Sequence, residues 1–126
     1  MPSLLSMGTK ILLVDDDNDV REVVKLFLER AGYIVEDKAN GNFVQELNTA
    51  TVPSLYILDR NLNGEDGLQL CRQIKSNPKT KDVPVLMLSA DPYIAILSKA
   101  AGANGYIEKP FERTMLIKKV AGYIGE

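Results

Sequence analysis

Four apolar segments of the sequence each end in residues that could take part in chemistry. Asp15 and Asp16 follow one segment, and Asp59, Ser89 and Lys109 follow the other three. Crowded carboxylates repel one another unless a cation lies among them. An all-oxygen donor set suits Mg²⁺, which favours sites that a phosphate completes. Lys109 adds a positive charge for an anion, and Ser89 adds a hydroxyl donor. Where such residues meet, they can move a phosphoryl group onto a carboxylate nucleophile.

Each of these residues also has a plainer interpretation by itself. The run Asp15–Asp17 could do no more than begin a helix, where the helix dipole favours acidic side chains. Ser89 is of a type common before a helix, and Lys109-Pro110 could merely begin the last one. The functional prediction therefore depends on the joint pattern.

The elements that must position these residues are strands alternating with helices. The apolar segments do not alternate with polar residues, which predicts a parallel sheet covered on both faces. We predict strands at 11–14, 33–35, 55–58, 83–88 and 105–107, and helices at 20–31, 42–48, 67–75, 92–101 and 112–123. Residues 62–65 are predicted to be a loop. This order predicts a doubly wound, three-layer α/β sandwich, in which the carboxyl ends of the strands face one crevice.

Composition bounds the class of protein. The chain has 126 residues, 45% apolar and 25% charged, which suits one globular domain. Its net charge is −2 and its basic residues are dispersed, which argues against a nucleic-acid surface. The single cysteine, Cys71, excludes an internal disulfide and fits a reducing compartment, so we predict the cytoplasm. The sequence has no histidine, which excludes histidine catalysis and histidine metal ligands.

Two further features concern the ends of the chain and membranes. No apolar run approaches the roughly 18 residues that a membrane span needs, so no membrane insertion is expected. Residues 1–9 lack the basic region of a signal peptide, and we interpret them as a flexible leader before a domain at 10–126.

Six short motifs resemble one known family. They are Val14-Asp15-Asp16, Leu58-Asp59, Asp66-Gly67, Ser89-Ala90, Gly102-Ala103 and the run from Tyr106 to Phe111. In this order they resemble the receiver domain of bacterial two-component response regulators, including the single-domain chemotaxis regulator. The resemblance covers roughly residues 10–123. It implies a flavodoxin-like fold with five parallel strands in the order 2-1-3-4-5 and five helices.

The resemblance implies specific roles at the metal site. Asp59 would accept a phosphoryl group from a phosphohistidine on a sensor histidine kinase or a histidine phosphotransfer protein. Asp16, Asp59 and the backbone carbonyl of Asn61 would bind Mg²⁺ directly, with Asp15 acting through water. Mn²⁺ could substitute for Mg²⁺. The domain would be a signalling phosphoacceptor that assists its own phosphorylation and autodephosphorylation, and not an enzyme with a separate substrate.

The resemblance also implies a conformational switch. Lys109 would pair with Asp59 and then with the phosphoryl oxygens, and the Lys109-Pro110 peptide would be cis. Ser89 would move to the phosphate and Tyr106 would turn inward behind it. The fourth helix, the fifth strand and the fifth helix would then present a changed face to a downstream protein or to a second copy in a homodimer.

Two features depart from the family pattern or tune it. Leu62-Asn63 stands where the family often has Met-Pro, which leaves the geometry of this loop open. Asn61 and Asp91 occupy the two positions that set how fast the family loses its phosphoryl group. Polar and acidic residues there predict a short-lived phosphorylated state.

Two other classes of function compete with the signalling interpretation. A Mg²⁺-dependent phosphohydrolase of the haloacid-dehalogenase type would place an aspartate two residues after its nucleophile, where this chain has Asn61. A receiver-shaped interaction module would never be phosphorylated, although here all the chemical positions hold competent residues. Within the signalling interpretation, the chain is either a stand-alone regulator or the receiver of a longer regulator or hybrid kinase.

Overall fold

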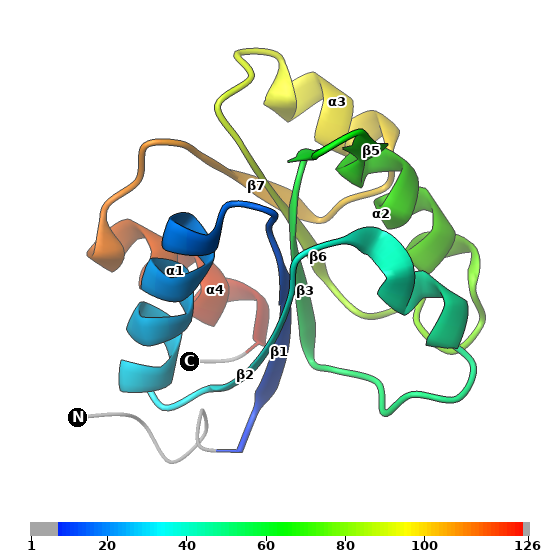
Figure 1. Ribbon diagram of the computed structural model, residues 1–126, viewed down its shortest axis with the longest axis horizontal. Helices are drawn as coiled ribbons and strands as arrows, with labels where there is room; N and C mark the ends of the chain where they lie inside the picture. The colour runs from blue at the N-terminus through cyan, green and yellow to red at the C-terminus, as the bar shows by residue number, and fades with distance from the viewer. Residues whose placement is uncertain (1–7, 125–126) are drawn as a thin grey trace.

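The structure is a computed structural model, and it describes residues 8–124 as a five-stranded parallel sheet between two layers of helices (Figure 1). The strands are β1 (Lys10–Val14), β2 (Ile34–Lys38), β3 (Leu55–Asp59), β6 (Val85–Ser89) and β7 (Gly105–Glu108). Their order is β2-β1-β3-β6-β7. Because β4 and β5 form a separate two-stranded sheet, this is the predicted 2-1-3-4-5 order.

Five helical segments cover the two faces of the sheet. Helices α1 (Asn18–Arg30) and α4 (Arg113–Ile124) lie on one face, while the 3-10 helix η1 (Gly41–Glu46), α2 (Gly67–Ser76) and α3 (Ile94–Ala100) lie on the other (Figure 1). In β1, Ile11 and Leu13 pack toward α1 and α4, and Leu12 and Val14 pack toward the opposite layer. The strand is therefore apolar on both sides, which explains its lack of alternation.

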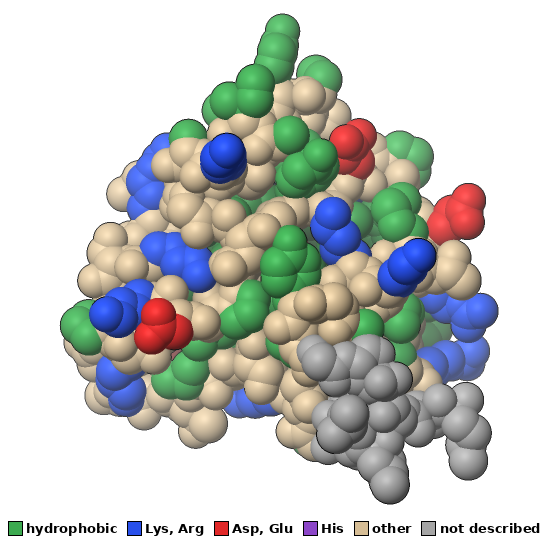
Figure 2. All heavy atoms as spheres, turned by 180° about the vertical axis from the view of Figure 1, so that it is seen from behind, with side chains coloured by type: hydrophobic (Ala, Val, Ile, Leu, Met, Phe, Trp, Pro, Cys, Tyr) green, Lys and Arg blue, Asp and Glu red, His purple; other side chains and the backbone are tan. Residues whose placement is uncertain are grey.

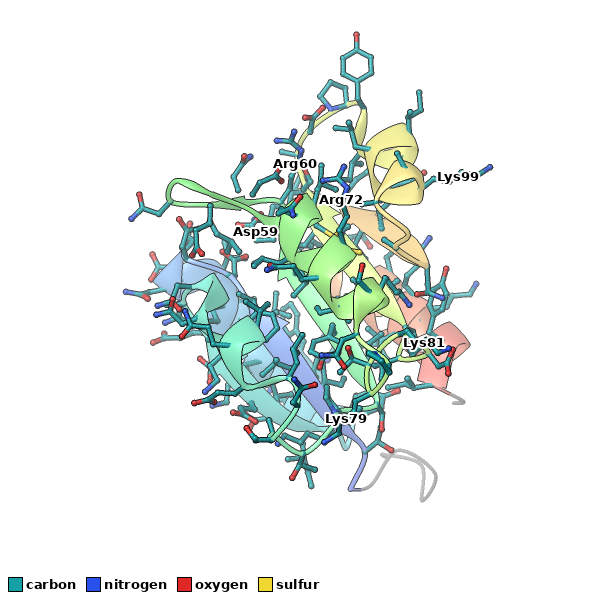
Figure 3. All side chains as sticks on the ribbon, turned by 90° about the vertical axis from the view of Figure 1, so that its right-hand side faces the viewer. Asp59, Arg60, Arg72, Lys79, Lys81 and Lys99 are labelled. Atoms are coloured by element: carbon teal, nitrogen blue, oxygen red, sulfur yellow. The ribbon has the colours of Figure 1, made fainter. Side chains whose placement is uncertain are left out.

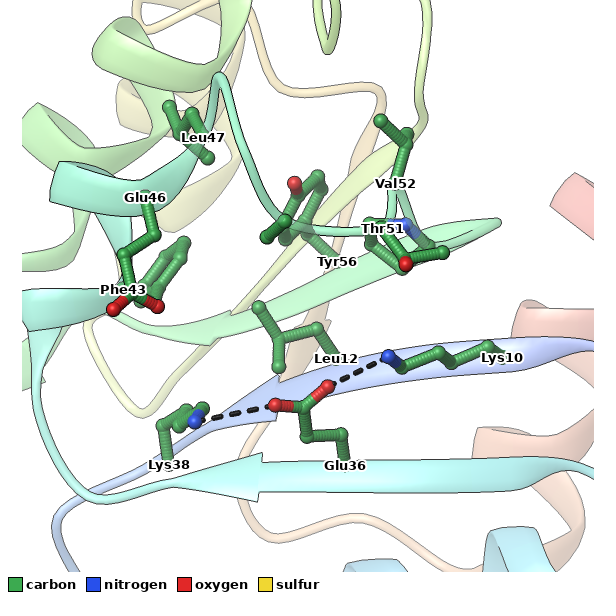
Figure 4. Close-up of a pocket in the computed structure, with 12 residues that line it drawn as sticks. Lys10, Leu12, Glu36, Lys38, Phe43, Glu46, Leu47, Thr51, Val52 and Tyr56 are labelled. Atoms are coloured by element: carbon green, nitrogen blue, oxygen red, sulfur yellow. Dashed lines mark ion pairs between the residues drawn. The ribbon is translucent and has the colours of Figure 1, made fainter.

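The helix predicted at 42–48 is present as the 3-10 helix η1, which ends two residues earlier, at Glu46. Its first residues, Gly41 and Asn42, have low helix propensity. Three-residue turns suit a short segment of this kind. A cavity of about 50 Å³ lies beside Tyr56 and is lined by residues of β1, β2 and η1. Glu36, on β2, pairs with Lys10 at 2.7 Å and with Lys38 at 3.2 Å along its wall (Figure 4).

The predicted loop at 62–65 is instead part of a small hairpin. Strand β4 (Asn61–Leu62) pairs with the antiparallel strand β5 (Glu65–Asp66). Asn63 and Gly64 connect them with φ angles of 45° and 95°. Positive φ at both central residues is the requirement of a type I′ turn, which asparagine and glycine meet.

The helix predicted to begin at residue 92 begins two residues later, at Ile94. Pro92 and Tyr93 lie in a turn that Asp91 closes. The Asp91 carboxylate accepts a hydrogen bond from the backbone N–H of Tyr93 at 2.8 Å, and its backbone carbonyl accepts one from Ile94 at 3.1 Å. Asp91 thus fixes the start of α3.

The described residues stop short of both ends of the sequence. Most of the predicted leader at 1–9, namely residues 1–7, lies outside the described residues, as do 125 and 126. Among residues 8–124, no helix is long and apolar enough to cross a membrane.

Candidate functional site

The carboxyl edge of the sheet brings the predicted chemical residues together. Asp15 and Asp16 follow β1, Asp59 ends β3, Ser89 ends β6, and Lys109 follows β7. The Lys109 Nζ atom lies 3.4 Å from Asp15 Oδ2 and 3.5 Å from Asp59 Oδ2. Asp15, Asp16 and Asp59 each offer a carboxylate oxygen within 4.8 Å of the others. We call these three residues and Lys109 the acidic cluster.

Burial controls the charge of the acidic cluster. Asp15 is 0% exposed and Asp59 is 6% exposed. Burial, together with the nearby Asp15 carboxylate, raises the pKa of Asp59 to about 6, although Lys109 acts in the opposite direction. When all three acids are ionised, the cluster carries three negative charges, and Lys109 supplies one positive charge.

The donors of the acidic cluster fit a hard divalent cation. All three acidic side chains offer oxygen, the ligand atom that Mg²⁺ and Mn²⁺ prefer. A dication would supply the positive charge that Lys109 leaves missing. Asp16 is less buried than the other two acids, so the cluster opens to solvent on its side.

The raised pKa of Asp59 predicts a pH-dependent metal affinity. Asp59 is predicted to be a metal ligand, and a ligand must lose its proton, so protons are expected to compete with Mg²⁺ below the pKa of about 6. We expect Mg²⁺ to bind about tenfold more weakly at pH 5 than at pH 7.5, since one proton is displaced per ion. Calorimetric titration at both pH values measures this difference. An affinity that stays constant between them would contradict it.

Arg21 braces the loop that carries Asp15 and Asp16. Its Nη1 atom donates to the backbone carbonyl of Asp15 at 2.7 Å, and its Nε atom donates to Asp37 at 2.9 Å. Asp15 also accepts from the backbone N–H of Asp17 at 2.9 Å. The sequence reasoning missed Arg21. A signal existed, because a cation near the start of a helix opposes the dipole and so suggests another role.

Gly67 allows α2 to begin against the strand that carries Asp59. Its backbone N–H donates to the carbonyl of Arg60 at 2.7 Å. A Cβ atom on Gly67 would lie 2.0 Å from the backbone oxygen of Asp59, closer than any real contact. Glycine is therefore required here by close backbone approach. The Asp66-Gly67 motif is visible in the sequence, but the close approach to Asp59 that requires glycine is visible only in the structure.

Ser89 connects the acidic edge to the start of α3. Ser89 is 2% exposed, and its hydroxyl accepts a hydrogen bond from the backbone N–H of Asp91 at 2.9 Å. A hydroxyl that accepts one bond keeps its own proton for another acceptor. Displacement of Ser89 would break this bond and disturb the turn that Asp91 closes.

Asn61 contacts Asp59 directly, whereas Tyr106 lies in β7 against the hydrophobic core. The backbone N–H of Asn61 donates to Asp59 Oδ1 at 3.3 Å. Tyr106 is half-buried in β7, and Lys119 Nζ lies 5.3 Å from the centre of its ring. The Lys109-Pro110 peptide is cis, as the resemblance implied.

A carboxylate cluster with a lysine, at the carboxyl edge of a doubly wound sheet, defines a class of phosphoacceptor domains. Residues 11–121 match the response regulator receiver domain family, and the chain belongs to that family. It is a phosphoacceptor signalling domain of the two-component type.

Relatives with known names agree with this assignment. The transcriptional regulatory protein GltR of Pseudomonas aeruginosa is 36% identical over 115 residues, which are 90% of this chain and 48% of GltR. The chain thus spans about half the length of the curated relatives that it matches. The chemotaxis response regulator CheY4 of Vibrio cholerae has a TM-score of 0.83 and 30% identity, covering 93% of this chain and 98% of CheY4.

One solved structure similar to this chain contains magnesium. The receiver domain of a sensor histidine kinase from Pseudomonas aeruginosa has a TM-score of 0.85 and 29% identity, covering 94% of this chain and 99% of that domain. Its structure has a magnesium ion coordinated in the active site cleft.

Proposed function

We propose that Asp59 takes a phosphoryl group from a phosphohistidine on a sensor histidine kinase or a histidine phosphotransfer protein. The observation that carries this proposal is the position of Asp59. It is the last residue of β3, it is 6% exposed, and Lys109 lies 3.5 Å away. Asp59 is thus a buried carboxylate with a cationic partner and two further acids beside it.

The chain's own residues then have distinct roles in the transfer. An Asp59 carboxylate oxygen attacks phosphorus, and the bond from phosphorus to the donor imidazole breaks. Lys109 neutralises a phosphoryl oxygen, and the Ser89 hydroxyl donates a hydrogen bond to another. Asp16, Asp59 and the Asn61 carbonyl would hold Mg²⁺ or Mn²⁺, with Asp15 acting through water. When bound, the ion neutralises charge on the phosphoryl oxygens.

Phosphorylation would switch the domain through the hydrogen bond between Ser89 and Asp91. When Ser89 turns to the phosphoryl group, the Asp91 N–H loses its acceptor, and the turn before α3 rearranges. Tyr106 would then turn inward behind Ser89. The region that responds comprises α3, β7 and α4, which correspond to the fourth helix, fifth strand and fifth helix of the family.

This responding face has features of a protein-binding surface. Its exposed apolar side chains are Tyr93 at 66%, Ile96 at 71%, Met115 at 47% and Tyr123 at 36%. In the view from behind, hydrophobic and basic side chains are interspersed and few acidic ones are visible (Figure 2). A downstream protein, or a second copy on phosphorylation, would bind here.

The wider setting follows from the same proposal. Residues 10–126 would form the domain, either as a stand-alone regulator or as the receiver of a longer protein, and it would act in the cytoplasm. It would catalyse its own autodephosphorylation, with Asn61 and Asp91 setting a short lifetime.

Intact-mass measurement with a small phosphodonor tests the proposal. Incubation with acetyl phosphate and Mg²⁺ is expected to add one phosphoryl group, and peptide mapping is expected to place it on Asp59. Hydroxylamine should remove it, because acyl phosphates react with this nucleophile. The sample without divalent metal serves as the control. A phosphoryl group on another residue, or one that resists hydroxylamine, would contradict the proposal.

A further inference from the structure

The side chain of Arg60 joins the two segments that flank the acidic cluster. Its Nη1 atom donates to Asn61 Oδ1 at 3.3 Å, and its Nε atom lies 3.7 Å from Asp91 Oδ2. Arg60 follows Asp59 directly at the end of β3 (Figure 3). Asp91 lies in the loop from β6 to α3. One guanidinium therefore contacts both residues proposed to set the lifetime of the phosphoryl group.

Both partners of the Arg60–Asp91 ion pair are held by their backbones. Arg60 donates through its N–H to the Leu88 carbonyl at 3.0 Å, and its own carbonyl accepts from Gly67. Asp91 is fixed by Ser89, Tyr93 and Ile94. Hydrogen bonds to Leu88 and Ser89, both in β6, thus hold the backbones of Arg60 and Asp91 just beyond the ends of β3 and β6.

The hydrogen-bonding state of Arg60 is unusual. Within residues 8–124, its Nε atom is the one buried side-chain nitrogen or oxygen that makes no hydrogen bond. The 3.7 Å separation from Asp91 is too long for a direct hydrogen bond and too short for a bridging water. A buried unpaired donor is unfavourable, and such groups are often found where a protein has a function for them.

We propose that Arg60 is a positioning residue that slows the loss of the phosphoryl group by holding the Asp91 carboxylate. This inference rests on the proposed function of Asp59. In the hydrolysis step, a water oxygen bonds to phosphorus, the bond from phosphorus to the Asp59 oxygen breaks, and inorganic phosphate leaves. A free Asp91 carboxylate at the rim would accept the proton that the water loses. When Asp91 is paired with Arg60, its negative charge is neutralised and its carboxylate faces the guanidinium.

Removal of Arg60 is therefore expected to change two rates in opposite directions. In Arg60→Gln, the guanidinium no longer neutralises the Asp91 carboxylate, and hydrolysis of the phosphorylated domain accelerates, by up to about fivefold for a partly exposed ion pair. The same uncompensated charge repels the acetyl phosphate anion, so phosphorylation slows by about twofold. A merely structural defect would slow both reactions.

The test measures both rates in wild type, Arg60→Gln, Asp91→Asn and the double variant, all at saturating Mg²⁺. The effect of Arg60→Gln on decay is expected to disappear in the Asp91→Asn background. The decay rate of Arg60→Lys is expected to lie between those of the wild type and Arg60→Gln. Lysine keeps the positive charge but lacks the planar set of guanidinium N–H donors. Arg72→Gln, which removes the same charge from the exposed face of α2 (Figure 3), is the matched control and should change neither rate.

The outcomes separate this inference from the proposed function. Equal decay of Arg60→Gln and wild type, acceleration that persists without the Asp91 carboxylate, or slowing of both rates would each overturn the role of Arg60 while leaving Asp59 as acceptor. A wild type that gains no phosphoryl group on Asp59 would overturn both. Thermal unfolding of each variant verifies that the rates come from folded protein.

Discussion

Replacement of Asp59 by asparagine is expected to abolish phosphorylation and to make the metal-free domain more stable. The pKa of Asp59 is raised to about 6 in the folded protein, so ionisation of this group disfavours folding as the pH rises toward and beyond that value. At pH 7.5, asparagine removes this unfavourable charge, and we expect about 2 kcal/mol more stability. Well below the ordinary aspartate pKa of 3.8, the carboxyl is protonated in both the folded and the unfolded state, and the difference should vanish.

Urea denaturation of both proteins between pH 4 and pH 8, in the presence of a chelator, measures the difference. Added Mg²⁺ should stabilise the wild type more than Asp59→Asn, because the variant lacks one ligand. Asp82→Asn removes an exposed carboxylate far along the chain and is the control, with an expected change within about 0.5 kcal/mol. A variant less stable than wild type at pH 7.5 would show that the Lys109 contact outweighs the burial of Asp59.

Replacement of Gly67 by alanine is expected to lower the free energy of unfolding more than any of the other substitutions considered. The new Cβ atom would lie 2.0 Å from the Asp59 carbonyl oxygen and 2.9 Å from its carbonyl carbon, both of them backbone atoms. No side-chain rotation relieves such a contact, so α2 must move away from β3. We expect a loss of about 3 kcal/mol or more, as for other severe overpacking.

Gly122→Ala supplies a matched control for this prediction. Gly122 lies in α4, and a Cβ atom there would meet nothing within 4 Å. Since alanine favours a helix more than glycine does, this variant should gain about 0.5–1 kcal/mol. Denaturant unfolding of both variants decides the matter. If Gly67→Ala had the same unfolding midpoint in denaturant as the wild type, the backbone of α2 could not lie as close to Asp59 as described.

The sequence was sufficient for the main architecture and for most of the site, because both depend on simple physical patterns. Unbroken apolar runs indicated buried parallel strands, and the polar residue at the end of each run indicated the shared edge. Asp15, Asp59 and Lys109 do meet there, and the Lys109 Nζ atom lies 3.4 Å from Asp15 Oδ2 and 3.5 Å from Asp59 Oδ2. The strand order came from the resemblance and not from periodicity.

Other features required the structure because they arise from contacts between distant segments. Arg60 and Asp91 are 31 positions apart in the sequence, and nothing in either residue type predicts their ion pair. Gly67 matters because of the backbone of Asp59, which no local pattern reveals. The hairpin of β4 and β5 is different, since its Asn63-Gly64 turn is a recognisable signal that was interpreted only as a loop.

The acidic cluster draws its side chains from the whole length of the chain, and this affects its assembly during synthesis. The hydrogen bond from Lys109 to Asp15 joins residues 94 positions apart. A growing chain has made all three acids of the cluster once residue 59 is added, but their lysine is added only fifty residues later. A partly synthesised domain therefore lacks the cation that compensates these carboxylates. The complete signalling site can therefore form only when synthesis of the domain is nearly finished.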